Sequence, residues 1–229
     1  MRRILPSVFI IWLGMTLAMP GADVDALIKQ AKSKDVDQRR NAFKELADAM
    51  AEAKAVLPTL LSGLQDEDRY VRRFAAQAIG KIDGLDSKKT MPAMLKIVND
   101  KAEAKEVQEA IVAAMGKLGK TAIDPLTKLL KDKDKELTVR GKAADALAII
   151  GPDARVALPT LLEVLNERAG GKNAETNLKL EAIEALGKIA MSKDADAITA
   201  LEGIEAMKTK DKAMKAAVTS ALKSIKGRK

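Results

Sequence analysis

Apolar residues beyond position 22 recur in pairs of short segments, and a charged turn divides each pair. In the clearest unit, residues 56–82, two such segments lie on either side of an acidic turn at residues 66–68. The apolar positions of each segment follow the three-and-four spacing that places them on one face of an α-helix. Neither helix can bury its own apolar face, so the unit predicts a helical hairpin that packs against neighbouring hairpins. These positions are Leu57, Leu60, Leu61 and Leu64 in the first segment, and Val71, Phe74, Ala75, Ala78, Ile79 and Ile82 in the second.

The same unit returns along the chain at a nearly constant period. Prolines near the start of the first segment lie 34, 33 and 34 residues apart, at Pro58, Pro92, Pro125 and Pro159. The second segments align independently on one apolar position, occupied by Leu46, Ile79, Met115, Leu147, Leu186 and Leu222. Hairpins repeated at this period are typical of a solenoid, in which each copy buries its apolar face against the next. We therefore predict an all-α protein, an α-α superhelical solenoid of about six hairpins, at about residues 23–50, 52–83, 87–118, 121–150, 153–190 and 195–226.

Composition favours the same fold class. The chain has 229 residues, of which 47% are apolar but only 2% are aromatic, so Ala and Leu supply most of the packing. Small side chains suit closely packed helices, whereas sheets are enriched in β-branched and aromatic residues. The fifth hairpin has a longer turn, at residues 166–177, which contains Gly170 and Gly171 and is expected to be mobile.

Three positions of the unit carry a pattern beyond simple amphipathicity: Pro58 in the first helix, Asp66 in the turn and Arg72 early in the second helix. This pattern resembles the HEAT repeat, in the short form also seen in phycobilisome-lyase-type repeat proteins, over about residues 23–226. The resemblance implies that the second helices line a concave surface and that the repeat itself carries no catalytic site. Pro125, Asp132 and Arg140 repeat the pattern with a residue of slippage, whereas Gln108, Lys179 and Lys215 stand where Arg72 does.

The N-terminal segment has the layout of a secretory signal peptide. A basic start precedes an apolar run at residues 4–19, and small residues follow. We predict that residues 1–22 are a bacterial-type signal peptide, cleaved after Ala18 or Ala22, and that residues 23–229 form an exported HEAT-like domain in the periplasm or outside the cell. An uncleaved anchor is the alternative, although the apolar run is shorter than the roughly 20 residues that span a bilayer. No stable membrane span is expected in the mature chain.

The chain contains no Cys and no His, which excludes disulfides, thiolate nucleophiles, imidazole bases and the commonest zinc ligands. Paired carboxylates such as Asp66 and Asp68 lie in turns, where Asp is the expected helix cap. We therefore predict that the protein is not an enzyme and has no cofactor and no metal site. A lyase-like role on a tetrapyrrole is suggested only by the resemblance, and the lack of Cys and His argues against it.

Tyr70 and Phe74 stand out in the alignment of the copies, because the other copies have mostly polar or small residues at these positions. The two aromatic residues lie one helical turn apart and have Arg69 and Arg73 beside them. Aromatic residues with an adjacent Arg are typical of a binding hot spot. The alternative is that the two rings fill a gap between adjacent repeats. Phe43 differs, since its equivalents are apolar, and we expect it in the core.

Basic residues on the second helices form another candidate surface, a stripe along the concave face that could bind a polyanion. The stripe comprises Arg39, Arg40, Arg69, Arg72, Arg73 and Arg140, and continues through Lys179 and Lys215. The alternative for Arg72 and Arg140 is that turn carboxylates such as Asp66 and Asp132 hold them in hydrogen bonds between repeats. The freer candidates are then Arg39, Arg40 and Arg73.

We predict a non-enzymatic exported scaffold that binds a protein or peptide partner on the concave surface, and we expect a monomer. The predicted partner-binding residues are Tyr70, Phe74, Arg73, Arg69, Arg40 and Arg39. The alternative function is polyanion binding, of nucleic acid or an acidic polysaccharide, through the basic stripe of a chain whose formal charge is +8. Export and the scarcity of aromatic stacking side chains argue against nucleic acid.

Overall fold

The computed structural model describes residues 23–48, 53–167, 172–207 and 210–228, and the predicted signal peptide lies outside these ranges. The described residues are helical, contain no strand and confirm the predicted fold class, with consecutive α-helices paired into hairpins. The pairs are α1 (Val24–Gln30) with α2 (Val36–Asp48), α3 (Ala53–Gly63) with α4 (Arg69–Lys81), α5 (Ser87–Val98) with α6 (Lys105–Met115), α7 (Ile123–Lys131) with α8 (Leu137–Ile150), α9 (Leu158–Asn166) with α10 (Lys172–Ile189), and α11 (Ala195–Ala206) with α12 (Lys212–Lys226).

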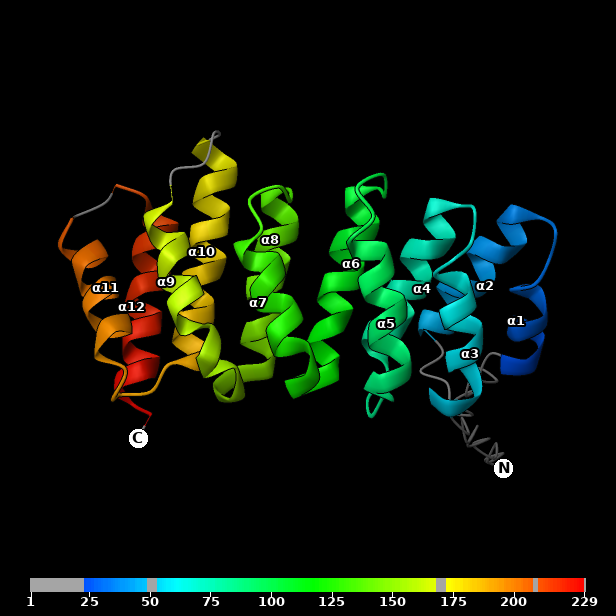
Figure 1. The fold of residues 1–229 in the computed structure, drawn as a ribbon, viewed down its shortest axis with the longest axis horizontal. Coiled ribbons are helices and arrows are strands. Elements are labelled where there is room, and N and C mark those ends of the chain that lie inside the picture. The colour runs from blue at the N-terminus through cyan, green and yellow to red at the C-terminus, as the bar shows by residue number, and fades with distance from the viewer. Residues whose placement is uncertain (1–22, 49–52, 168–171, 208–209, 229) are drawn as a thin grey trace, which may run out of the picture.

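The hairpins stand side by side in one elongated row, which runs from α1 at one end to α12 at the other (Figure 1). The odd-numbered first helices form one layer and the even-numbered second helices form the other, and each second helix packs against the second helices of its neighbours. The turns inside the hairpins therefore line one long edge of the row. The connections between hairpins line the opposite edge.

One apolar core runs through the row between the two layers. Leu60 of α3 and Leu64, which follows its last residue, are fully buried against the second-helix layer, where Ile79 is also fully buried. Phe43 is buried as predicted, and its ring occupies the space beside Gly63, where an added Cβ would come within 2.2 Å of the ring. Burial of these side chains against adjacent hairpins is the main stabilising contribution, because an isolated short helix is marginal in water.

Small residues allow close contact between neighbouring second helices near the C-terminal ends of these helices. A Cβ on Gly80 would lie 3.3 Å from the Cα of Ala114, and a Cβ on Gly187 would lie 2.9 Å from the Cα of Ala221. A larger side chain at either glycine would push the neighbouring backbone away. The glycines therefore let the backbones of neighbouring second helices come into close contact.

Two of the four repeat prolines lie near a helix start as predicted, and two do not. Pro125 and Pro159 lie in the first turns of α7 and α9, after 3₁₀ segments at residues 116–122 and 151–157. Pro58 and Pro92 lie inside α3 and α5, each preceded by more than one helical turn, which corrects their predicted position. A proline in the first turn of a helix costs no internal hydrogen bond, because the N–H groups there have no partner within the helix.

The fifth hairpin differs from the expectation of a long turn at residues 166–177. Helix α10 begins at Lys172, because residues such as Ala174 and Glu175 favour helix, and only residues 168–171 of that turn lie outside the described ranges. With 18 residues α10 is the longest described helix. Neither it nor any other helix in the described ranges has the length and apolar character needed to cross a membrane.

Candidate partner-binding surface

A ladder of arginines ties the turns of successive hairpins together. Arg72 donates hydrogen bonds to the Asp66 and Glu67 carbonyl oxygens of its own turn, and its Nε and Nη2 reach the Glu103 carboxylate of the next turn at 2.6 and 2.7 Å. Arg140 is only 2% exposed and donates to the carbonyl oxygen of Leu130 and to the Glu167 carboxylate at 2.8–2.9 Å. We call Arg39, Arg72 and Arg140 with their carboxylates Asp66, Glu103 and Glu167 the turn ladder.

Arg39 belongs to the turn ladder, and the prediction that it is a free surface residue is wrong. It is 8% exposed, bonds the Ser33 and Lys34 carbonyl oxygens of its own turn, and pairs with Asp66 at 2.8 Å. The sequence contains the signal for this role, since Arg39 precedes Leu46 by the same seven residues that separate Arg72 from Ile79.

The prediction of hydrogen bonds between repeats is confirmed for Arg72 and Arg140, but the carboxylates differ from those expected. Each arginine pairs with a carboxylate from the following turn, Glu103 or Glu167, rather than with Asp66 or Asp132. The reason is that backbone carbonyl oxygens of the same hairpin accept some of the N–H groups of each guanidinium. The remaining N–H groups are left for a carboxylate of the next hairpin. The ladder is interrupted at Gln108, whose amide donates to the Asp100 carbonyl oxygen of its own turn.

Tyr70 lies at the centre of a group of guanidinium groups on the second-helix layer. The Arg40 and Arg69 guanidinium carbons are each 5.0 Å from the Tyr70 ring centroid, and that of Arg73 is 5.7 Å away. Arg69 also donates a hydrogen bond to the Tyr70 hydroxyl at 3.0 Å. Arg73 lies over the Phe74 ring as well, at 5.3 Å. The structure thus brings together five of the six predicted partner-binding residues, and we call Tyr70, Phe74, Arg40, Arg69 and Arg73 the aromatic cluster.

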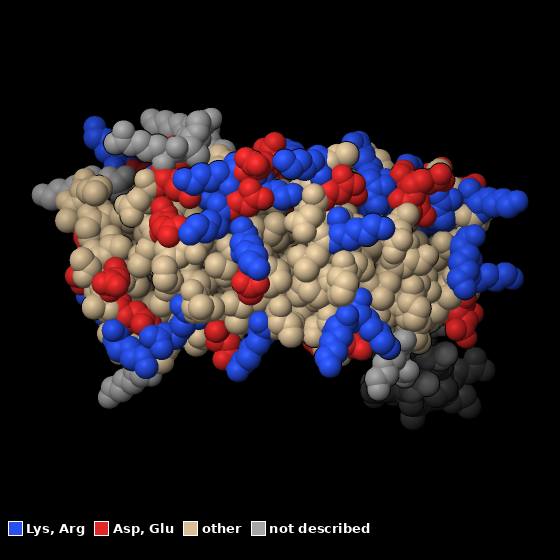
Figure 2. Space-filling model, viewed as in Figure 1, with Lys and Arg blue, Asp and Glu red and all other residues tan. Residues whose placement is uncertain are grey.

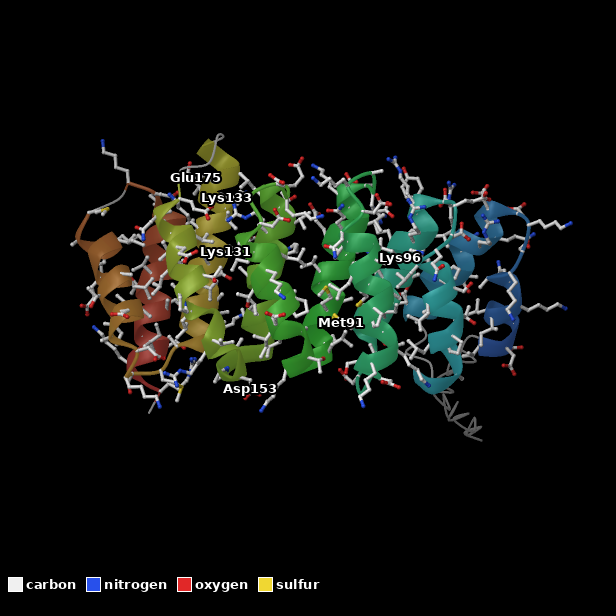
Figure 3. The ribbon with its side chains drawn as sticks, viewed as in Figure 1. Met91, Lys96, Lys131, Lys133, Asp153 and Glu175 are labelled. Atoms are coloured by element: carbon white, nitrogen blue, oxygen red, sulfur yellow. The ribbon has the colours of Figure 1, made fainter. Side chains whose placement is uncertain are left out.

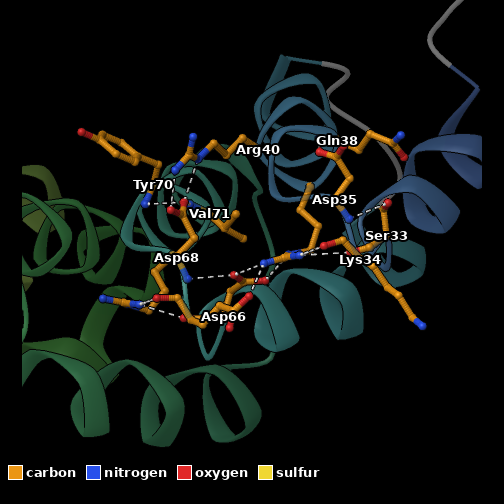
Figure 4. A network of polar contacts seen from close by, with 12 residues as sticks. Ser33, Lys34, Asp35, Gln38, Arg40, Asp66, Asp68, Tyr70 and Val71 are labelled. Atoms are coloured by element: carbon orange, nitrogen blue, oxygen red, sulfur yellow. Dashed lines mark hydrogen bonds and ion pairs between the residues drawn. The ribbon is translucent and has the colours of Figure 1, made fainter.

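Arg40 is less free than expected, because it is bound to the Asp68 carboxylate. Its Nη2 lies 2.6 Å from Asp68, which also caps α4 by accepting from the backbone N–H groups of Tyr70 and Val71. Hydrogen bonds from Arg40 and from these N–H groups lower the pKa of Asp68 to about 2. Figure 4 shows the Arg40 guanidinium beside the Tyr70 ring and bonded to Asp68. Arg40 therefore positions the cluster and has little capacity left for a ligand.

Arg73 has no carboxylate partner among the described residues. Its Nε is buried and makes no hydrogen bond, and its guanidinium lies over the rings of Tyr70 and Phe74. A buried donor without a partner is uncommon, since leaving it unsatisfied costs about 1–3 kcal/mol. Arg73 is thus the cation of the cluster that has most to gain from a ligand acceptor.

A groove of about 740 Å³ opens on the second-helix layer beside Arg73 and Phe74. Its floor consists of small and apolar residues, and charged residues stand along its walls. This groove shows that the second-helix layer is hollowed, as the HEAT resemblance implied. We call it the second-helix groove, and its lining residues are Lys44, Ala47, Asp48, Arg73, Phe74, Ala76, Gln77, Gly80, Lys81, Glu106, Glu109, Ala110, Ala113, Ala114 and Lys142.

The second-helix layer does not carry the continuous basic stripe that the sequence predicted. Glu109 of α6 and Glu181 of α10 interrupt it, and Lys142 between them pairs with Asp145 at 2.8 Å. Burial raises the pKa of Glu181 to about 7, and the nearby carboxylates of Asp145, Glu184 and Glu109 add to this shift. Carboxylates are therefore interspersed with the cations of the layer from α6 to α10.

A second hollow, of about 680 Å³, lies near the turn edge between α7 and α9. Lys131 and Lys133 line it, and Figure 3 labels both on the face of the molecule formed by the first helices. Its carboxylates are already paired, Glu163 with Lys131 and Glu167 with Arg140. It has no apolar floor, which makes it a weaker candidate than the second-helix groove. On this face the charged side chains gather along the two edges of the row (Figure 2).

The side chains in the second-helix groove offer both charged groups and apolar contact area. They comprise the half-buried Phe74 ring, the Arg73 guanidinium, lysines, a glutamine, alanines and carboxylates. The described residues contain no group of three or more carboxylates placed to hold a metal ion.

Sequence comparison identifies the family that this architecture indicates. The family model described as HEAT repeats matches residues 24–105 and, in a second overlapping match, residues 91–172. The chain belongs to the HEAT-repeat family. The two matches cover the turn ladder, the aromatic cluster and the second-helix groove. No curated protein matches this HEAT-repeat chain significantly.

Solved structures of helical solenoids resemble this HEAT-repeat protein over nearly its whole length. An engineered protein of the Northeast Structural Genomics Consortium is 21% identical with a TM-score of 0.60, and the alignment covers 90% of this chain and 99% of that one. A designed armadillo repeat protein in complex with the peptide (KR)4 is 19% identical with a TM-score of 0.61, covering 89% and 100%. The phycocyanin lyase complex from Nostoc is 25% identical with a TM-score of 0.48, covering 88% and 82%. The first two likenesses show the solenoid fold.

Proposed function

We propose that this HEAT-repeat protein is a non-enzymatic, exported scaffold that binds a segment of a partner protein in the second-helix groove. The observation that carries the proposal is the groove itself, which sets Arg73, a cation with a buried and unsatisfied Nε, beside the Phe74 ring and an alanine floor. A ligand acceptor could pair with the Arg73 guanidinium, which has no carboxylate partner among the described residues, and apolar ligand atoms would cover the ring and the floor.

The chemistry of the aromatic cluster supports a protein partner. Tyr, Phe and Arg present large rigid contact areas, and Tyr and Arg are enriched among residues that dominate binding energy. Tyr70 is 38% exposed in spite of its three guanidinium neighbours, so one part of its ring is open to a ligand. The designed armadillo repeat protein noted above binds a peptide, which supports the use of a similar solenoid surface for the same purpose here.

A scaffold role without catalysis is supported by the residue types in the chain. Neither Cys nor His is present, so the usual nucleophile–base pairs and the imidazole general base are absent from the sequence. Export is supported by the signal-like composition of residues 1–22. The partner is then a protein of the same extracytoplasmic space.

A photo-cross-linking experiment tests the proposal. Benzoylphenylalanine in place of Gln77, an exposed residue that lines the groove, is introduced into the full chain in the cells that naturally produce it. We expect a discrete cross-linked protein that is lost when the same chain also carries Tyr70→Ser and Phe74→Ser. The matched control removes two exposed apolar side chains outside the groove, Val156→Ser and Met207→Ser, which are 74% and 79% exposed.

The control variant is expected to keep the cross-linked protein. Equal cross-linking by the cluster variant and the control would contradict the proposal. Circular dichroism of each variant confirms that the helical fold is retained, since Phe74 also packs against the core.

A second candidate, polyanion binding, is favoured by the three guanidinium groups gathered around Tyr70. It is the weaker candidate, because Arg40 is committed to Asp68 and carboxylates interrupt the rest of the layer. Titration of a DNA duplex or an acidic polysaccharide over rising salt decides it. Electrostatic binding must weaken by orders of magnitude between low and moderate salt, and binding that is insensitive to salt would exclude this function.

A further inference from the structure

The connection between the second and third hairpins contains a reactive pair of residues, Asp83 followed by Gly84. It is the only place in the sequence where an Asp or an Asn precedes a Gly. Such a pair is reactive because the backbone nitrogen of the second residue can attack the side-chain carboxyl carbon of the first. Glycine hinders this attack least, since it has no Cβ.

The structure leaves both reacting groups open to solvent. Helix α4 ends at Lys81 and α5 begins at Ser87, so Asp83 and Gly84 lie in the link between them. Both residues are exposed, and the side chain of Asp83 is 87% exposed. A Cβ added at Gly84 would meet open space beyond its chain neighbours. No packing therefore shields the Gly84 nitrogen from the Asp83 carboxyl group.

Neither reacting group is held firmly by other contacts. The Gly84 N–H donates no hydrogen bond to another described residue, and its φ of +70° is a left-handed conformation that glycine adopts readily. Within the described part of the chain, the Asp83 carboxylate makes one ion pair, with the Lys117 Nζ at 3.2 Å. Exposed ion pairs contribute little, so this contact leaves the carboxyl group free to turn toward the nitrogen.

We propose that Asp83 is a site of spontaneous isomerisation to isoaspartate, through a succinimide formed with the Gly84 backbone nitrogen. The carboxylate takes a proton from solvent, the nitrogen forms a bond to Cγ, and the N–H proton leaves with the hydroxyl group as water. Water then opens the succinimide ring. Attack at Cγ restores aspartate, whereas attack at the backbone carbonyl carbon of Asp83 leaves the peptide bond on Cγ, which is isoaspartate. Water is the only co-reactant, and nothing is oxidised or reduced.

Asp86 provides an internal comparison in the same link. It is the N-cap of α5, and its carboxylate accepts the backbone N–H of Lys88 at 3.1 Å. The following residue, Ser87, is the first residue of α5 and carries a side chain that hinders attack by its nitrogen. Asp86 should therefore remain aspartate while Asp83 isomerises.

Isomerisation alters the link beside the second-helix groove. The chain through Asp83 gains one backbone atom, and the free carboxylate is then attached directly to Cα, so the geometry of the Lys117 ion pair is not preserved. Gly80 and Lys81, at the end of α4, line the groove just before this link. The modification thus changes the joint between two hairpins that both line the groove. This inference does not depend on the proposed function.

Peptide mapping of the full protein tests the proposal. After storage in warm neutral buffer, trypsin releases residues 82–88, which contain both Asp83 and Asp86. Isoaspartate has the same mass as aspartate but changes the retention of the peptide in reversed-phase chromatography, and electron-transfer fragmentation locates it. We expect isoaspartate at Asp83 at least about tenfold more often than at Asp86, because only Gly84 lacks a Cβ. Fresh protein digested in the same way should contain little of it.

Asp83→Glu is the matched variant, because it keeps a carboxylate near Lys117 but would have to close a larger and less favourable ring. It should give no isomerised product at position 83 under the same storage. The proposal is overturned if Asp83 and Asp86 isomerise equally or not at all, or if fresh and stored protein contain equal amounts. Isomerisation that occurs only when the protein is stored unfolded in urea would also overturn it, since the folded link would then protect Asp83.

Discussion

Arg72 and Arg73 are adjacent in sequence, yet they belong to regions of the molecule with opposite properties. Arg72 is part of the turn ladder, where two backbone carbonyl oxygens and the Glu103 carboxylate occupy its donors. Arg73 lies one residue further around the same helix, over two aromatic rings and without a carboxylate. The hydrogen bonds of Arg72 hold one hairpin to the next. Arg73 lies in the groove without a carboxylate partner among the described residues, so its guanidinium can still bind another molecule.

The comparison shows that positive charge alone does not indicate a ligand site in a repeat protein. Backbone carbonyl oxygens and a carboxylate of the next turn hold each of Arg39, Arg72 and Arg140. Arg69 and Arg73 face the groove or its rim, and the groups nearest to them are rings rather than carboxylates. The partners of an arginine therefore decide whether it stabilises the fold or binds a ligand.

Removing a ladder arginine should produce the largest effect on stability. Arg140→Met leaves the Glu167 carboxylate and the Leu130 carbonyl oxygen without their partner, and we expect the free energy of unfolding to fall by about 3–5 kcal/mol. Arg73→Met is the matched control and should change stability by less than about 1 kcal/mol, since no ion pair is lost. Urea denaturation followed by circular dichroism measures both. Similar losses for the two variants would remove the distinction between the regions.

Truncating the rings of the aromatic cluster should have the next largest effect, on binding rather than on folding. Tyr70→Ser with Phe74→Ser is expected to weaken partner binding by about 2 kcal/mol, a factor of about 30, because the anchoring contact area is removed. The yield of the Gln77 cross-link gives the relative affinity, and Val156→Ser with Met207→Ser should leave it unchanged. An unchanged affinity in the cluster variant would show that the rings only fill space between repeats.

Restoring the missing ladder residue should have a smaller and stabilising effect. Gln108→Arg places a guanidinium between its own turn and the carboxylates of the turn at residues 132–136, where Lys135 now reaches back to the Val98 carbonyl oxygen. We expect the free energy of unfolding to rise by up to about 1 kcal/mol, the usual range for a partly exposed ion pair. A loss of stability in urea would show that Lys135 already replaces the arginine.

The smallest expected effect is a pH dependence carried by Glu181. Its pKa is raised from 4.5 to about 7 by burial and by Asp145, Glu184 and Glu109, with Lys142 opposing the shift. The folded state therefore binds the proton more tightly than the unfolded state, so this contribution to stability is complete below pH 4.5 and is lost as the pH rises through 7.

Glu181→Gln should remove that loss, so that the variant gains stability relative to the unaltered protein at pH 8 but not at pH 4. Urea denaturation at the two pH values measures the difference. Asp68 provides a control of opposite sign, because its pKa is lowered to about 2 and its contribution is lost as the pH falls from 3.8 through 2. An identical pH profile for Glu181→Gln and the unaltered protein would contradict this assignment.

The solenoid could be predicted from sequence because periodic apolar positions and repeated prolines are local signals. The aromatic cluster could also be predicted, since Tyr70 and Phe74 depart from the pattern of the other copies. The ion pair of Arg40 could not be predicted without the neighbouring turn, which contributes Asp68 from 28 residues away.

The carboxylates that lie around Glu181 were missed for a different reason. Glutamates are common on the exposed faces of helices, so Glu109 and Glu181 carry no signal of their own in a single sequence. Only the stacking of α6, α8 and α10 brings them together. The one local hint is Gly141, a glycine inside a helix, which leaves space for the Glu181 carboxylate.

Asp68 connects the aromatic cluster to the first hairpin, at one end of the row. Its carboxylate caps α4 and holds Arg40 of α2, so the position of the Tyr70 ring depends on the first hairpin being docked. Terminal units of a solenoid open more readily than central ones, because they have a neighbour on one side only. A ligand bound to Tyr70 contacts both the first and the second hairpin, and its binding energy would slow hydrogen exchange in α1, which lines no part of the groove.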